Sequence, residues 1–409
     1  MRIAYVVPYV PNLIRTRPYN LITQLASLGH EVEVFTLGSG RQDLVDAQTL
    51  RLKCSDVHYH AQPVWRSLLN SAAAVPSCQP LQSVYSWQGE MARKLAERVS
   101  NKAFDIVHVE HLRGSRYGVF IKSKFPTVPV VWDSVDCISH LFQQAAGRSS
   151  SFFGKFVTRF EVLRTRKAEG KLVRSFDHVL VTSSADKNAL LELVSGRRDP
   201  SPISILPNGV DLDYFRPNPK INRDTATIVF SGKMSYHANI SMVEYLVAEI
   251  MPRIWRACPQ THLFIVGKDP PSDIKKLKKN PLISVTGTVD DIRPFLWRAT
   301  ISVVPLLYGA GIQNKILEAM ATGTPVITTS LTLSALQVQP GRDLLVADDA
   351  DEFAQSILRL MNDGHLKHTM SDSGLAYVRG NHDWNSIASQ MTNIYQNTLN
   401  KSEVFQNRH

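Results

Sequence analysis

The chain has 409 residues and a net charge of +10; 44% of its residues are hydrophobic and 20% are charged. This length exceeds one ordinary core and the composition is globular, so we expect two domains and exclude global disorder. The opening run "MRIAYVVPYVPN" is too short for a secretory signal and no segment has the roughly 20 apolar residues of a membrane span, so we expect a cytoplasmic protein.

Short apolar runs alternate with amphipathic stretches along the whole chain, a pattern typical of parallel sheets covered by helices on both faces. The expected strands are 2–9, 31–38, 105–110, 128–134, 178–183 and 203–208, followed by 227–232, 261–267, 282–289, 301–305, 325–329 and 343–347. Two such series predict an α/β protein with two doubly wound, Rossmann-like domains that face each other across a cleft.

The domain boundary is expected at the segment 208–226, which is rich in Asn, Asp and Pro. We therefore predict an N-terminal domain over 1–207, a C-terminal domain over 208–385, and a final helix and tail over 386–409. Packing of that helix back onto the N-terminal domain is one option that the sequence leaves open. The segment 143–154, "QQAAGRSSSFFG", is expected to be a mobile loop.

Polar residues follow three strands of the first half, at the edge where ligands of open α/β sheets bind. They are Asn12, Arg15 and Arg17 after the first strand, Glu110, His111 and Arg113 after the third, and Asp133 and Asp136 after the fourth. Arginines suit phosphate binding, and either aspartate could accept a proton. The alternatives are a solvated arginine loop, a capped strand end at His111, and helix N-caps at the aspartates.

The segment 155–174, "KFVTRFEVLRTRKAEGKLVR", has seven basic residues against two glutamates, with interleaved Phe and Leu. A basic amphipathic helix can lie on an anionic membrane surface. The alternative is an ordinary packed helix with a charged outer face. The net positive charge fits phosphates or anionic lipids equally, and since no nucleic-acid-binding signature is present we expect no nucleic-acid partner.

The run "LLYGAGIQNKILEAMATGTPVITT" joins a strand to a short apolar helix. Gly309 and Gly311 let the backbone approach a ligand, and the helix N-terminus offers free N–H groups to an anion. Glu318, expected two turns inside the helix, could accept hydrogen bonds from the vicinal hydroxyls of a ribose. The alternative is a glycine hinge before a packed helix with a solvated acid.

Metal and cofactor signatures are not found. The cysteines Cys54, Cys78, Cys137 and Cys258 have no paired spacing, so we expect free thiols rather than disulfides or a zinc site. The acidic triplet "DLD" at 211–213 lies in the interdomain segment, away from any strand end. We therefore expect no metal and no cofactor.

Several segments, in order, resemble family 4 of the retaining glycosyltransferases, which have the GT-B fold. They are "ISILPNGVDLDYFRP", "LFIVGK", "VTGTVDDIRPFLWRATISVVPL", "GAGIQNKILEAMATGTPVITT" and "GRDLLVADDADEFAQSILRLMND". Together they cover most of 203–385, whereas the first half matches only in its opening strand, "ASLGHEVEVFTLG" and general layout. The resemblance implies that the C-terminal domain binds a nucleotide-activated sugar and the N-terminal domain holds the acceptor.

The resemblance also implies roles for individual residues. Glu318 would bind the ribose and Lys233, after Gly232, the diphosphate as a catalytic cation. The remaining donor contacts would be Gly309, Gly311, Ile312 and Gln313 along the sugar and diphosphate, and Gly267, Lys268, Thr288 and Val289 around the base. The acceptor-binding candidates are Asn12, Arg15, Arg17, His111 and Asp133, with Asp136 as the catalytic proton acceptor.

The chain departs from the family pattern in its donor loop. Ala310 stands where the family has its first glutamate, so the sugar contact is lost or is supplied by Gln313 or Asn314. Asn239 or Ala238 stands where a second cation is expected, and Lys315 could compensate. The glycine-rich loop after the first strand and the histidine after the fourth are also absent.

We therefore expect a retaining glycosyltransferase that moves a hexose from a UDP- or GDP-sugar to a hydroxyl acceptor, such as a sugar phosphate, a lipid-linked glycan or a polysaccharide precursor. Two alternatives stay open. One is a nucleotide-sugar epimerase or hydrolase of related fold, and the other is a non-catalytic nucleotide-sugar-binding scaffold, which Ala310 suggests. Peripheral contact with an anionic membrane at the inner face is a further option.

Overall fold

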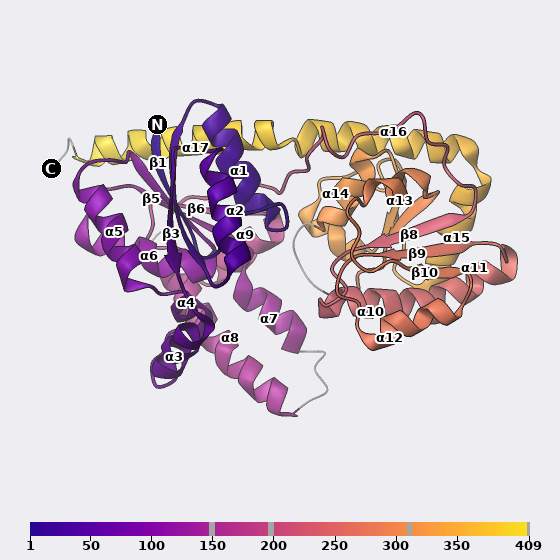
Figure 1. The fold of residues 1–409 in the computed structure, drawn as a ribbon, viewed down its shortest axis with the longest axis horizontal. Helices are drawn as coiled ribbons and strands as arrows, with labels where there is room; N and C mark the ends of the chain where they lie inside the picture. The colour runs from indigo at the N-terminus through magenta and orange to yellow at the C-terminus, as the bar shows by residue number, and fades with distance from the viewer. Residues whose placement is uncertain (147–151, 195–199, 309–312, 407–409) are drawn as a thin grey trace. The chain divides into compact units, whose positions relative to one another are not determined.

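The structure is a computed structural model that describes residues 1–146, 152–194, 200–308 and 313–406 (Figure 1). The chain forms two compact units: Met1–Pro207 with Trp384–His409, and Asn208–Asp383. Each unit is a parallel sheet with helices on both faces. The expected α/β architecture of two Rossmann-like domains is therefore confirmed.

The N-terminal unit contains a sheet of order β3-β2-β1-β4-β5-β6-β7. Its strands are β1 Arg2–Val7, β2 Glu31–Gly38, β3 Asp56–Ala61, β4 Ile106–Glu110, β5 Val130–Val135, β6 His178–Val181 and β7 Ile203–Ile205. Its helices are α1 Thr16–Ser27, α2 Arg41–Arg51, α3 Val64–Ala74, α4 Leu81–Tyr85, α5 Gly89–Ser100, α6 His111–Lys124, α7 Ile138–Ala146, α8 Phe152–Leu172 and α9 Ser184–Glu192. The strand order reverses between β1 and β4, the point where open sheets bind ligands.

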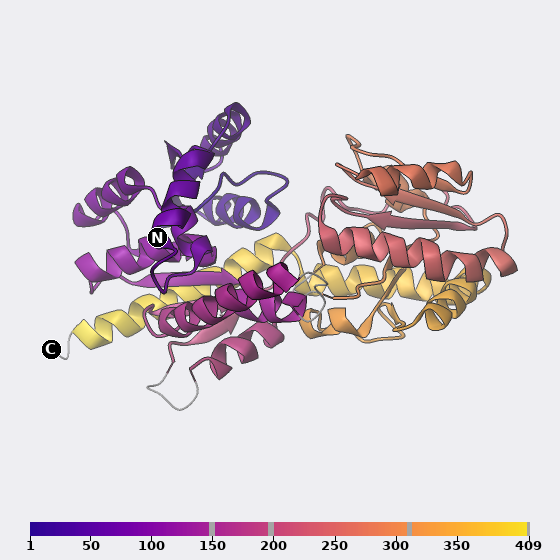
Figure 2. The same ribbon diagram turned by 90° about the horizontal axis from the view of Figure 1, so that it is seen from below.

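The last helix, α17 (Trp384–Gln406), belongs to the N-terminal unit and runs along it (Figure 2). Its apolar residues, including Trp384 and Met391, join the core between the sheet and α1. The hydroxyl of Tyr395 lies 2.9 Å from Nδ1 of the buried His108 on β4. A hydrogen bond between His30 and Thr392, at 3.0 Å, adds a second polar anchor.

The C-terminal unit has the strand order β10-β9-β8-β11-β12-β13. Its strands are β8 Thr227–Ser231, β9 His262–Val266, β10 Ile283–Val285, β11 Ile301–Val304, β12 Val326–Thr328 and β13 Leu345–Val346. Its α-helices are α10 His237–Tyr245, α11 Met251–Ala257, α12 Ser272–Lys276, α13 Arg293–Arg298, α14 Asn314–Ala321, α15 Ala350–Asn362 and α16 Gly364–Asn381. One continuous apolar core, in which β8 and β11 are fully buried, fills this unit.

Two details differ from the sequence prediction. Strand β3 was not expected, because its sequence "DVHYHA" has few apolar residues. The predicted loop over 143–154 is partly helical, since α7 extends to Ala146 and α8 begins at Phe152. The middle of that loop, 147–151, lies outside the described residues.

Candidate functional site

In the C-terminal unit, the carboxyl ends of β8 and β9 are in close backbone contact. A Cβ at Gly267 would lie 1.8 Å from the carbonyl oxygen of Gly232, and one at Gly232 would lie 2.8 Å from Nδ2 of Asn239. The amide of Met234 donates to the carbonyl oxygen of Lys268 at 2.9 Å. Because φ of Gly267 is also +148°, both space and backbone conformation require glycine there.

Lys315, in the first turn of α14, is a buried cation at this edge. Its Nζ donates to Oδ1 of Asn239 at 2.6 Å and lies 4.6 Å from the centroid of the Phe230 ring. The Nδ2 of Asn239 donates to the carbonyl oxygen of Lys233 at 2.9 Å, which fixes the amide. Burial lowers the pKa of Lys315 to about 7, while the charge of Glu318 opposes that shift. Lys315 and Asn239 are thus direct neighbours, and a role of Lys315 as a substitute cation stays a prediction.

Glu318 lies one turn inside α14 rather than two, because the helix begins at Asn314. Its side chain is partly exposed. Burial raises the pKa of Glu318 to about 7, and the charge of Lys315 acts in the opposite direction. Among the described residues, no donor forms a hydrogen bond with its carboxylate. The carboxylate therefore has acceptor capacity for a ligand.

The other predicted donor residues are less defined by their contacts. Gly309, Ala310, Gly311 and Ile312 lie outside the described residues. Gln313 is the N-cap residue of α14 without a side-chain cap, and Asn314 accepts a hydrogen bond from Asn208 at 3.3 Å. Lys233 and Thr288 are exposed, Lys268 is half-buried, and Val289 packs against the core.

Sequence reasoning missed an aromatic pair beside the donor loop. The rings of His237 and Tyr308 stack with centroids 5.5 Å apart, and Nδ1 of His237 lies 2.8 Å from the Tyr308 hydroxyl. Ser241 lies 3.2 Å from the same hydroxyl. The pair ties the start of α10 to the residue just before the glycine-rich run. The position of Tyr308 directly before "GAG" was the available signal.

In the N-terminal unit, a buried polar network lies beneath the carboxyl edge of the sheet. Arg17 donates to Oδ2 of Asp133 from Nε at 3.1 Å and from Nη2 at 2.8 Å. The hydroxyls of Tyr5 and Tyr9 donate to Glu110 at 2.9 and 2.8 Å. Burial raises the pKa of Glu110 to about 7. Because Arg17 and Asp133 are buried and paired, the geometry favours a positioning role for them over direct contact with an acceptor.

His111 stands at the direct junction of β4 and α6 with φ of +64°. Its Nδ1 is buried and has no hydrogen-bond partner in the part of the chain that the structure describes. Burial, followed by the charge of Arg113, lowers the pKa of His111 to about 4. The ring is therefore neutral at pH 7. Non-glycine residues in this backbone region concentrate at functional sites, which keeps His111 a candidate.

Asp136 is partly exposed just after β5. Burial, followed by the charge of Asp186, raises the pKa of Asp136 to about 7, and the Thr182 hydroxyl donates to it at 3.4 Å. The amides at the start of α7 are bound by other carboxylates: Asp186 accepts from Cys137 at 2.8 Å and Glu169 from Ile138 at 2.8 Å. Asp136 therefore remains available for a proton-accepting role.

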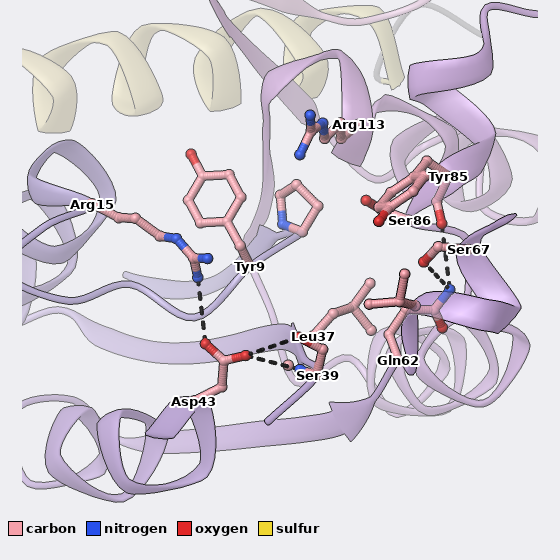
Figure 3. Close-up of a pocket in the computed structure, with 13 residues that line it drawn as sticks. Tyr9, Arg15, Leu37, Ser39, Asp43, Gln62, Ser67, Tyr85, Ser86 and Arg113 are labelled. Carbon is pink, nitrogen blue, oxygen red and sulfur yellow. Dashed lines mark hydrogen bonds and ion pairs between the residues drawn. The ribbon is translucent and has the colours of Figure 1, made fainter. Parts of the chain in front are cut away.

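Asn12 and Arg15 lie on the loop after β1. The Nδ2 of Asn12 donates to Asp46 at 2.7 Å, and its Oδ1 accepts from the amides of Ile14 and Arg15, so this side chain holds the loop. Arg15 lines a cavity together with Arg113, which sequence analysis noted but did not assign (Figure 3). The side chain of Arg15 also lies 3.7 Å from Asp43.

The described residues include no group of three or more His, Cys, Asp or Glu side chains that could hold a metal ion. None of their helices is long and apolar enough to cross a membrane. Over the same residues, Cys54, Cys78, Cys137 and Cys258 are free thiols.

Family models match both units. The model described as Glycosyltransferase Family 4 matches residues 15–214, and the one described as Glycosyl transferases group 1 matches residues 225–363. The chain belongs to the family 4 glycosyltransferases. This glycosyltransferase is 23% identical to an MMP alpha-(1->4)-mannosyltransferase of Mycolicibacterium hassiacum, over 93% of each chain. It is 22% identical to a phosphatidyl-myo-inositol mannosyltransferase of Mycolicibacterium smegmatis, over 97% of this chain and 94% of the relative.

Among solved structures, the glycosyltransferase resembles the Anabaena protein HepE in complex with UDP and glucose. The TM-score is 0.66 at 15% identity, with 97% of this chain and 99% of that chain covered. At this identity the likeness concerns the fold, which is GT-B.

Proposed function

We propose that this glycosyltransferase is a retaining, metal-independent enzyme. It transfers a hexose from a UDP- or GDP-sugar to a hydroxyl acceptor, such as a sugar phosphate, a lipid-linked glycan or a polysaccharide precursor. The observation that carries the proposal is the hydrogen bond from Lys315 to Asn239. Lys315 lies on α14, the helix that also bears Glu318. Two mannosyltransferases among the relatives, and the structural neighbour that contains UDP and glucose, support a nucleotide-sugar donor.

The donor chemistry needs positive charge on the leaving group. A nucleoside diphosphate gains negative charge as it departs, and fixed cations stabilise that charge most effectively where water is excluded. Lys315 is buried and Lys233 is exposed at the same strand ends. A diphosphate beside Lys315 favours the ammonium form and raises its pKa above 7. These two lysines supply the stabilisation that a divalent ion gives in other transferases.

On the acceptor side, Asp136 is the proposed proton acceptor. Its pKa of about 7 suits proton transfer at neutral pH. In same-face substitution the leaving phosphate can take the proton itself, and Asp136 then orients the acceptor hydroxyl. Arg15 and His111 would complete this side, with Asn12 holding the loop after β1 and Arg17 and Asp133 supporting the edge of the sheet from beneath.

Peripheral contact with an anionic membrane is part of the proposal. Helix α8 carries the basic segment, and its Arg164 donates to the carbonyl oxygen of Val75, directly after α3. Helix α3 exposes Trp65, Leu68 and Leu69, whose exposed fractions are 63%, 58% and 60%. An exposed apolar helix face next to basic side chains is typical of surfaces that bind lipid headgroups.

Product analysis with radiolabelled UDP- and GDP-sugars tests the function. A panel of sugar phosphates, polyprenyl-linked sugars and phospholipids serves as acceptors, each with and without a chelator. Transfer that persists with the chelator supports the proposal. An acceptor-independent change of the donor sugar would indicate an epimerase, release of free sugar alone a hydrolase, and nucleotide binding without any product a scaffold.

A further inference from the structure

A cavity of about 200 Å³ lies within the N-terminal unit, at the carboxyl edge of its sheet (Figure 3). Its walls come from the ends of β1, β2 and β3 and from the first turn of α6. The cavity borders the place where the strand order reverses, since Tyr9 follows β1 and Arg113 follows β4. Pockets for drug-sized ligands hold roughly 300–1,000 Å³, so a cavity of this size suits a single sugar ring.

The cavity has a fixed polar floor. Gly38 leaves no room for a side chain, since a Cβ there would lie 2.4 Å from the ring of Tyr59. The carbonyl oxygen of Gly38 accepts a hydrogen bond from the backbone N–H of Gln62 at 2.8 Å. The Gln62 side chain is only 6% exposed, and its Nε2 donates to Ser67 at 3.2 Å. Within the described ranges, Oε1 of Gln62 has no donor and is closed to solvent, so the floor is held by Nε2 and the backbone rather than by this oxygen.

The cavity is also positively charged on one side. Arg15 is partly neutralised by Asp43, which lies 3.7 Å away and also accepts from the amide of Ser39. Arg113 is partly exposed and forms no ion pair in the part of the chain that the structure describes, so its terminal N–H groups are open although its Nε is buried. Its guanidinium lies 5.8 Å from the centroid of the Tyr85 ring. The arginine therefore has open donors for an anion.

We propose that this cavity binds an acceptor with one polyhydroxylated ring and one anionic group. Arg113 would bind the anion, and Tyr9 and Tyr85 would flank the ring (Figure 3). A guanidinium recognises phosphate and carboxylate alike, so the shared chemistry is an anionic sugar or polyol. This inference rests on the proposed glycosyltransferase function, for which it names the class of acceptor.

The test is a binding titration of the full chain with UDP or GDP present at saturation, so that the donor site is closed to phosphate. The probes are glucose 6-phosphate, myo-inositol 1-phosphate and glucuronate, each paired with glucose or myo-inositol. At least one anionic probe should bind about tenfold or more tightly than its neutral parent, because a charge-assisted hydrogen bond contributes about that much. The phosphate and carboxylate arms then tell the two anions apart.

Arg113→Gln should abolish this preference, and Arg113→Lys should restore part of it. The matched control is Arg116→Gln on the same helix, whose guanidinium stacks over Trp87 at 4.6 Å and does not line this cavity. The inference is overturned if no anionic probe outbinds its parent, or if Arg113→Gln behaves as Arg116→Gln does. Nucleotide binding, measured first in the same sample, separates this failure from failure of the proposed function.

Discussion

Lys315 contacts Asn239, which stands where a second cation was expected. It reaches Asn239 from the first turn of α14 and packs on Phe230. We expect Lys315→Met to weaken UDP binding by about tenfold or more, since a charge-assisted hydrogen bond to the diphosphate is lost. Uridine, which has no phosphate, should bind equally to both proteins. Calorimetry with the two ligands measures this, and equal loss for both would contradict a role at the diphosphate.

Replacement of Glu318 should affect UDP and uridine alike, in contrast to replacement of Lys315. If its carboxylate accepts hydrogen bonds from the ribose, Glu318→Ala should weaken UDP and uridine by similar factors, about tenfold or more. Glu244→Ala, an exposed glutamate on α10, is the matched control and should leave both affinities unchanged. Unchanged UDP affinity in Glu318→Ala would remove this residue from the donor site. Thermal unfolding of both variants checks that the fold is intact.

Glu110 should make stability depend on pH. Burial raises its pKa from 4.5 to about 7, so between these values the unfolded chain releases a proton that the folded chain keeps. The stability that Glu110 contributes is therefore complete below pH 4.5 and lost as the pH rises through 7. Relative to the wild type, Glu110→Gln should gain on the order of 1–3 kcal/mol between about pH 5 and about pH 8.

Denaturant unfolding at both pH values measures this gain, and Glu192→Gln, at an exposed position, controls for removal of one carboxylate. A difference between Glu110→Gln and the wild type that stays constant with pH would show that burial does not raise the pKa of Glu110.

At the scale of elements, apolar patterning predicted most of the strands of both sheets. It did not predict β3, the polar strand at the edge of the N-terminal sheet. Strand β3 is the edge strand of its sheet, paired with β2, and carries His58, whose Nε2 lies 2.9 Å from Glu33. An edge strand that is half solvated has no continuous apolar run, so its sequence resembles a loop. The buried strands β8 and β11 have such runs and were predicted.

The candidate sites were predictable to different extents. The motif around Glu318 and Lys315 allowed candidate donor residues to be named from the sequence, because both lie on one short helix. The pairing of Arg17 with Asp133 was not foreseeable, since it joins residues 116 positions apart. The cavity with Gln62 depends on β3, the strand that the sequence prediction lacked.

Helices α3 and α8 should together give binding to anionic vesicles that weakens at high salt, because ions screen surface charge. Leu68→Ser with Leu69→Ser should reduce binding at low salt by removing the apolar face of α3. The double variant Lys167→Gln with Lys171→Gln should make the vesicle binding less dependent on salt. Leu52→Ser, at a residue that is 84% exposed on the same unit, is the apolar control. Cosedimentation measures the bound fraction. Absence of binding at low salt would show that the two helices do not form a membrane-binding surface.

For the whole molecule, the chemistry that each unit offers bears on the stereochemistry of transfer. Inversion in one step needs a general base opposite the leaving group, whereas same-face retention lets the leaving phosphate accept the proton. The second route asks mainly for orientation and for charge stabilisation of the diphosphate. The C-terminal unit provides Lys315 and Lys233 for that purpose.

We therefore expect the anomeric configuration of the donor sugar to be retained in the product. Ala310 lies outside the described residues; by the family resemblance, a side-chain contact to the donor sugar is lost there or is supplied by Gln313 or Asn314. Ala310 should relax or change the choice of sugar and leave the stereochemistry unaltered, because the diphosphate contacts do not depend on it. Proton NMR of the isolated product from an α-linked donor measures the configuration. An α-linked product is the expected outcome, and a β-linked product would contradict retention even if transfer itself were efficient.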